Sequence, residues 1–147
     1  MSHAADYFSE EQQQQIKNAV KQAEQLTSGE IRVCIDSKIT GDAYTRAIEC
    51  FHQLKMHETK LRNGVLIYIA IENKQFAVIG DSGIHQHVHQ TFWDNLKDEM
   101  IPFFKEGNFT GGLLHAIAQT GNALVKHFPY QKNDSNELAD DIIFGNS

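Results

Sequence analysis

The stretch FHQLKMHETKLRNGVLIYIA, residues 51–70, decides the fold of this chain, because a helix ends within it and a buried strand begins. Its end continues into the apolar run GVLIYIAI, residues 64–71, which is typical of a strand covered on both faces. The residues at 73–74, Asn and Lys, allow a tight reversal into QFAVIG, residues 75–80. The sequence therefore predicts a central strand and an antiparallel neighbour, followed by the turn GDSGI at 80–84.

Another strand is predicted at residues 30–36, where EIRVCID alternates apolar and polar residues. The alternation suits a strand that is covered more fully on one face and lies near an edge of the sheet. A helix between this strand and the run at 64–71 would make the two strands parallel. Apolar residues at helical spacing predict helices at residues 10–27, at 42–56, from residue 84 to a break at 106–108, and from there to Pro129, with Pro102 kinking the third helix or ending its regular part.

Together these elements predict an α/β fold, namely a single-domain α/β/α sandwich. About four helices would cover a small mixed sheet of two parallel strands plus an antiparallel hairpin strand. The length of 147 residues, of which 41% are hydrophobic, suits one core. The domain is expected to span residues 9–129, between a flexible N-terminus at residues 1–8 and an acidic, disordered tail at residues 130–147.

Composition excludes several classes of protein. The formal net charge is -6, and no cluster of Lys and Arg interleaved with aromatic residues predicts a nucleic-acid interface. Neither a signal peptide nor a membrane-spanning run is evident, so a cytoplasmic protein without direct membrane insertion is expected. Cys34 and Cys50 form no CxxC pair and lie among core-type residues, which favours reduced packing cysteines over a disulfide or a redox role.

The predicted strand order brings Glu30, Asn63 and Asp81 to one end of the sheet. Adjacent strands lie about 4.8 Å apart, so these side chains could converge on one ion. Two carboxylates and an amide oxygen are donors that Ca²⁺ and Mg²⁺ prefer. The alternative is ordinary turn chemistry, in which Asp81 caps the following helix and Asn63 bonds nearby backbone. A phosphate could also approach this edge, through Arg62 and the amides of residues 82–85.

The opposite end of the sheet holds a second, weaker acidic cluster, formed by Asp36, Asp42 and Glu72. It predicts either a second cation site or simply solvated loop carboxylates. His85 and His89 would share a helix face at a spacing able to chelate zinc or nickel, although solvated histidines are the favoured interpretation. Trp93 lies beside an inward stripe and is predicted to pack in the core or at its rim.

Four segments, in order, resemble the TPM domain family, and most closely its bacterial branch. They are TSGEIRV at 27–33, MHETKLRNGVLIYIA at 56–70, GDSGI at 80–84 and GGLLHAIAQTGNALVKHFP at 111–129. The resemblance implies a sheet sandwiched between helices with divalent-metal sites at loop ends. It also implies a possible acid phosphatase, an activity proposed for a thylakoid-lumen member. His85 occupies a position that is Glu in another branch, so the metal ligands of that branch do not transfer directly.

The favoured function is a domain that binds Ca²⁺ or Mg²⁺ at the sheet edge and serves as a binding or regulatory module. One alternative is a metal-dependent acid phosphatase, a phosphomonoesterase in which the cation activates water or clamps phosphate oxygens. A second alternative is an adaptor whose acidic tail and residues 142–144, IIF, bind a membrane-associated partner. The resemblance supports such a partner, because many relatives carry a membrane anchor and this chain shows none.

Overall fold

The computed structural model of the chain describes residues 3–131 and 142–145 and contains one mixed sheet of four strands in the order β3-β2-β1-β4. As predicted, β1 and β2 are parallel, and β2 and β3 are antiparallel. The predicted α/β class is confirmed, with a fourth strand that the sequence did not suggest. The strands are β1 Glu30–Asp36, β2 Gly64–Ala70, β3 Gln75–Gly80 and β4 Ile143–Phe144.

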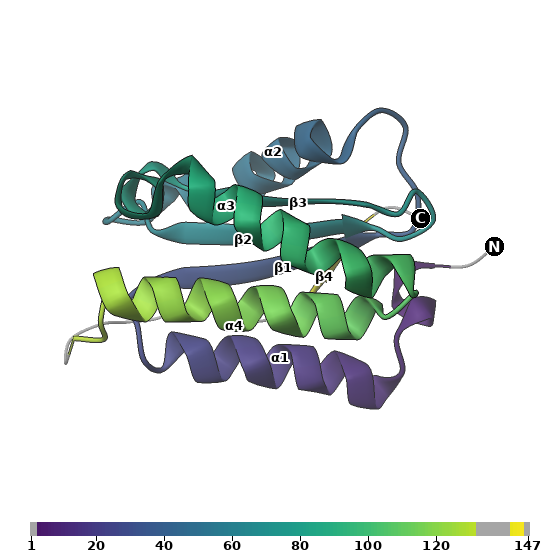
Figure 1. Ribbon diagram of the computed structural model, residues 1–147, viewed down its shortest axis with the longest axis horizontal. Helices are drawn as coiled ribbons and strands as arrows, with labels where there is room; N and C mark the ends of the chain where they lie inside the picture. Colours follow the sequence, from purple (N-terminus) through teal and green to yellow (C-terminus); the bar gives the residue numbers. More distant parts are fainter. Residues whose placement is uncertain (1–2, 132–141, 146–147) are drawn as a thin grey trace.

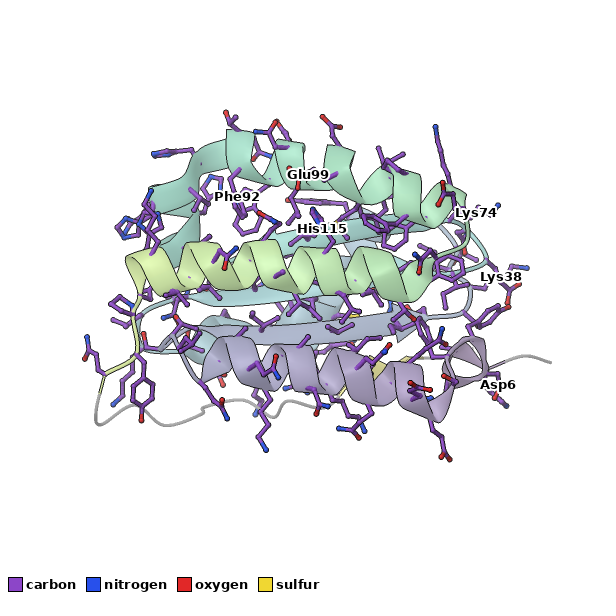
Figure 2. The ribbon with its side chains drawn as sticks, turned by 60° about the horizontal axis from the view of Figure 1, so that its bottom comes forward. Asp6, Lys38, Lys74, Phe92, Glu99 and His115 are labelled. Atoms are coloured by element: carbon purple, nitrogen blue, oxygen red, sulfur yellow. The ribbon has the colours of Figure 1, made fainter. Side chains whose placement is uncertain are left out.

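Helices cover both faces of the sheet (Figure 1). The helices α1, α4 and α3 lie side by side over one face, and α2 covers the other. Figure 2 shows α1, α4 and α3 as one layer. Glu99 of α3 and His115 of α4 lie between these two neighbouring helices, with Glu99 Oε1 and His115 Nε2 2.6 Å apart. The helices are η1 Ala4–Tyr7, α1 Glu10–Glu24, α2 Ala43–Gln53, η2 Met56–Glu58, α3 Ser82–Lys105 and α4 Phe109–His127.

Side-chain caps fix where the helices begin. The Ser9 hydroxyl accepts a hydrogen bond from the Gln12 amide at 3.0 Å, and the Gln12 side chain accepts one from the Ser9 amide at 2.9 Å. This is the predicted capping box of α1. Asp42 caps α2 and Asn108 caps α4 in the same way, each accepting from an amide three residues ahead. The turn residues of the sequence therefore set the starts of these helices.

Strand β2 is central, as its apolar run predicts, and all seven of its residues are buried. Val65, Ile67 and Ile69 belong to the core beneath α1, α3 and α4. Leu66 and Tyr68 belong to the second core, beneath α2. The alternation of strand side chains thus divides one continuous run between two cores.

The sheet order confirms that β1 lies near an edge, but the expectation that one of its faces is less covered is wrong. All seven residues of β1 are buried, and β4 pairs with it in parallel, Cys34 opposite Ile143 and Ile35 opposite Phe144. Residues 142–144, which the adaptor hypothesis places on a partner, thus pack against the sheet of their own chain. Strand β4 has only two residues, which is too few for a periodic pattern, and it lies far from β1 in the sequence.

The N-terminal segment also differs from the flexible N-terminus expected at residues 1–8. Ala4 is 0% exposed and Phe8 5% exposed, and both belong to the core beneath α1 and α4. The ring of Phe8 lies 6.5 Å from that of Phe144, so the two terminal segments meet. Ala4 and Phe8 are too few and too isolated to form a helical or strand pattern, so the sequence did not predict their burial. Most of the predicted acidic tail, residues 132–141, lies outside the described residues.

Helix α3 is interrupted at His89, where φ is 62° and ψ is 174°, and not at Pro102, which remains inside the helix. Trp93 follows the break and is only 5% exposed, which confirms its predicted packing. Its ring lies against Gly80, where an added Cβ atom would be 2.2 Å away. Among the described residues, no helix is long and apolar enough to cross a membrane.

Candidate functional site

The structure brings Glu30, Asn63 and Asp81 to the same end of the sheet, the left end in Figure 1. Glu30 lies opposite Gly64 in the register, and its amide donates to the Asn63 carbonyl at 3.3 Å. The Asp81 amide donates to the Gly64 carbonyl at 2.9 Å. Glu30 and Asp81 therefore flank Gly64 on neighbouring strands, as the predicted strand order requires.

All three of these polar side chains are buried. Glu30 and Asn63 are each 2% exposed, and Asp81 is 7% exposed. Gly64 places no side chain between the two acidic residues, and an added Cβ atom there would lie 3.2 Å from the main-chain oxygen of Met56. Burying a carboxylate is costly unless it is paired. The edge therefore concentrates oxygen atoms, including one from the main chain of η2.

Asp81 is paired with Arg62 through two hydrogen bonds. The Arg62 Nε donates to Oδ2 at 2.6 Å, and Nη2 donates to Oδ1 at 2.8 Å. The Asp81 side chain is 6% exposed, whereas that of Arg62 is 49% exposed. The hydrogen bonds that Arg62 donates to Asp81, and the negative charge of that carboxylate, raise the pKa of Arg62. Oδ1 also accepts from the Ser82 amide at 2.8 Å, which confirms the predicted helix cap.

The donors expected to bind a phosphate are engaged within the protein. The guanidinium of Arg62 bonds to Asp81, and the Gly83 amide donates to the Arg62 carbonyl at 2.7 Å. The His85 amide donates to the Asp81 carbonyl at 2.9 Å. Of the amides of residues 82–85, those of residues 82, 83 and 85 thus already donate to acceptors within the protein.

The second predicted cluster separates into three unrelated roles. Asp36 is 1% exposed and accepts from Arg46 Nε at 2.9 Å and from the Tyr68 hydroxyl. Asp42 caps α2, and Glu72 accepts from the Tyr7 hydroxyl at 3.1 Å. Asp36 and Asp42 share the lining of an open pocket of about 560 Å³, but Glu72 does not line it.

Burial and the hydrogen bond to Asp36 raise the pKa of Tyr68, so the phenol stays protonated and donates. The hydrogen bond from the Thr45 amide lowers the pKa of Asp42. Neither Arg46 nor Tyr68 was singled out from the sequence, because the packing of α2 on the sheet decides which side chains meet Asp36. The only hint in the sequence is that Arg46 is a charged residue in the helix that follows the strand ending at Asp36.

The predicted pairing of His85 with His89 on one helix face does not form, because His89 interrupts the helix. His85 Nδ1 instead accepts from Trp93 Nε1 at 3.0 Å. Within residues 3–131 and 142–145, no three His, Cys, Asp or Glu side chains gather closely enough to hold a metal ion. The sheet edge contributes only two such groups, Glu30 and Asp81, and the rest of its oxygens come from an amide and the main chain.

The position of His127 is expected to make stability dependent on pH. The rings of His87 and His127 stack 4.7 Å apart. This contact joins the beginning of α3 to the end of α4. Burial, then the neighbouring His87 and Lys126, lower the pKa of His127 below its ordinary value of 6.5. The unfolded chain therefore takes up this proton more readily, and the stabilising contribution is complete above pH 6.5 and lost as pH falls through the lowered pKa.

His127→Gln is accordingly expected to flatten the fall of the melting temperature between about pH 7 and pH 5, because the lowered pKa is removed. Thermal unfolding followed by circular dichroism across this range would measure the slope. Gln86→Asn, an uncharged substitution at an exposed position on α3, is the control and should leave the slope unchanged. Equal slopes for the wild type and His127→Gln would contradict the prediction.

The model of one family, the TPM domain, matches residues 1–123. The chain belongs to the TPM domain family. The match includes the whole sheet edge with Glu30, Asn63 and Asp81. It also confirms the resemblance carried by the strand and turn motifs. No functionally curated protein matches the sequence.

Solved structures show the same fold as this TPM domain. The NMR structure of BA42 protein from the psychrophilic bacterium Bizionia argentinensis is 43% identical, with a TM-score of 0.88, and the match covers 99% of this chain and 100% of that one. The N-terminal domain of a P. gingivalis protein is 18% identical, with a TM-score of 0.70, over 86% and 84% of the two chains. The N-terminal domain of the cg2496 protein from Corynebacterium glutamicum is 17% identical, with a TM-score of 0.57, over 80% and 74%. The last two support the fold alone.

Proposed function

We propose that this TPM domain binds a divalent cation, Ca²⁺ in preference to Mg²⁺, at the sheet edge and acts as a binding or regulatory module. One observation carries the proposal: two buried acidic residues, Glu30 and Asp81, flank a glycine on neighbouring strands. Asn63 adds an amide oxygen from the same end of the sheet. Carboxylate, amide and main-chain oxygens are the ligands of hard cations.

Arg62 occupies the position of a competing cation. Its guanidinium neutralises Asp81, yet its side chain is 49% exposed, so it can leave towards solvent without breaking the core. A doubly charged ion would take over both oxygens of Asp81 and draw on Glu30, Asn63 and the main-chain oxygen of Met56. Ca²⁺ accepts six to eight oxygens in irregular geometry, whereas Mg²⁺ demands a near-ideal octahedron, so such a mixed ligand set favours Ca²⁺.

Calorimetric titration of Ca²⁺ into the full chain, with amide shifts followed by NMR, tests this proposal. Binding should shift the amides of residues 30, 63 and 81. Glu30→Gln should abolish binding, because it removes a charge at nearly constant shape. Asp81→Asn should do the same, and it preserves the cap of α3 because asparagine caps as well as aspartate.

Arg62→Gln provides the sharper test, because it removes a positive charge next to the site. Affinity for Ca²⁺ should rise by about tenfold once the competing guanidinium is gone. Lys74→Gln, which removes the same charge at the opposite end of the sheet (Figure 2), is the matched control and should change nothing. Binding that is unaffected by Glu30→Gln, or weakened by Arg62→Gln, would refute the proposed site.

The phosphatase alternative predicts more than binding. A bound cation could clamp phosphate oxygens and activate water, so a generic phosphomonoester would be hydrolysed in the presence of Ca²⁺ or Mg²⁺. The proposed binding module should show cation binding without turnover. Turnover that disappears both with a chelator and in Asp81→Asn would instead establish the phosphatase.

A further inference from the structure

The two cysteines of the chain lie in contact, although sixteen positions separate them. Cys34 belongs to β1 and Cys50 to α2, and their Sγ atoms are 3.5 Å apart. Both thiols are free and buried, at 1% and 3% exposed. The sequence favours two independent packing cysteines, but the structure joins them into one dithiol between a helix and a strand.

The dithiol lies beside charged and polar groups. Asp36 is two residues after Cys34 on the same strand, and Arg46 is one turn before Cys50 on the same helix. These two form an ion pair at 2.9 Å and line the open pocket of about 560 Å³. Solvent and small solutes therefore reach the groups next to the thiols, even though the sulfur atoms are covered.

The two thiols differ in reactivity. The hydrogen bond between them, and then burial, raise the pKa of Cys34. The same hydrogen bond lowers the pKa of Cys50, burial opposes this, and the charge of Arg46 lowers it further. Cys50, which lies one helical turn from the guanidinium of Arg46, is therefore the expected nucleophile, because the thiolate is the reactive form of cysteine. Cys34 is placed to react second.

We propose that Cys34 and Cys50 form a redox-active dithiol that peroxides oxidise to an intrachain disulfide, tying α2 to β1. The Cys50 thiolate attacks one peroxide oxygen, the O–O bond breaks, and the leaving hydroxide takes the proton given up by Cys50 to form water. Cys50 becomes a sulfenic acid. Cys34, as it loses its proton, attacks that sulfur, and the S–O bond breaks to release a second water. Two thiols are oxidised and one peroxide is reduced.

The geometry suits this second step. A disulfide needs its sulfur atoms about 2.05 Å apart, so the observed 3.5 Å must close by only about 1.5 Å. The nucleophile and its target are already held together, which raises their effective concentration. Oxidation to the disulfide should therefore outrun further oxidation of Cys50.

Hydrogen peroxide added to the reduced full-length protein tests the proposal. Intact mass spectrometry should show the loss of two hydrogens in the monomer, restored by dithiothreitol. In the native protein the Cys50 sulfenic acid should not accumulate, because the fold holds Cys34 beside it for the second step. Thiols that persist in the native protein under conditions that oxidise the denatured chain would overturn the proposal, as would sulfinic or intermolecular products.

Single variants assign the two roles. Cys34→Ser, which keeps a hydrogen-bond donor beside Cys50, should stop at the Cys50 sulfenic acid, which dimedone traps. Cys50→Ala should leave Cys34 unreactive over the same time. Arg46→Met should slow the reaction of Cys50 severalfold, whereas Lys38→Met, on the rim of the same pocket, should not. Trapping at Cys34 in place of Cys50 would refute the assignment, and the wild-type measurement stands even if a variant fails to fold.

Discussion

Gly83→Ala is expected to lower the free energy of unfolding by about 3 kcal/mol, as a strongly overpacked core substitution does. Replacing glycine by alanine within a helix normally stabilises it, by about 1 kcal/mol. Here the added Cβ atom would lie 2.0 Å from the Leu61 carbonyl oxygen and 2.5 Å from that of Arg62. Both obstacles are main chain and cannot rotate away. The start of α3 must therefore move, and with it Asp81.

Urea unfolding followed by circular dichroism measures this change. Ser82→Ala, at the exposed neighbouring position, is the matched control and should remain within about 0.5 kcal/mol of the wild type. A Gly83→Ala protein as stable as the wild type would show that the segment before β2 yields easily. In that case the sheet edge would be less rigid than the contacts imply.

Asp36→Ala is the second substitution with a large expected effect, a loss of about 3–5 kcal/mol. Asp36 accepts hydrogen bonds from the Tyr68 hydroxyl and from Arg46. Tyr68 is 0% exposed, so its hydroxyl would lose its acceptor where water cannot replace it. Arg46 would lose its ion-pair partner at the same time.

The matched variant Tyr68→Phe removes the hydroxyl and should cost only about 1 kcal/mol. Asp36→Ala combined with Tyr68→Phe should therefore lose less than the sum of the two single changes, because the double variant leaves no stranded phenol. Denaturant unfolding of the four proteins gives the coupling. Strict additivity would mean that the hydroxyl and the carboxylate do not depend on each other.

The sequence predicts elements well where a long periodic or apolar run exists. The run at 64–71 identified the central strand, and the short turn after it fixed the antiparallel hairpin. It predicts poorly where one or two residues act through tertiary contact. Strand β4 has two residues, and Ala4 and Phe8 are isolated apolar residues. Such short segments cannot be told apart from ordinary loop sequence, because they show no periodicity.

The sheet edge illustrates the same division. Strand directions alone placed Glu30, Asn63 and Asp81 at one end, and the structure does the same. The hydrogen bonds of Arg62 to Asp81 were not predicted, because they depend on the left-handed backbone of Arg62, whose φ is 51°. The contact of Cys34 with Cys50 depends on how α2 sits over β1, which no local pattern encodes.

The order of the strands also bears on how the chain matures. A ribosome synthesises β1 at residues 30–36 well before β4 at residues 143–144, which pairs with the outer side of β1. Until they emerge, unpaired amides and carbonyls of that strand remain available to neighbouring nascent chains. Protection of this side of β1 during translation thus depends on β4, and a stop codon before residue 143 would leave Cys34 and Ile35 without their strand partners.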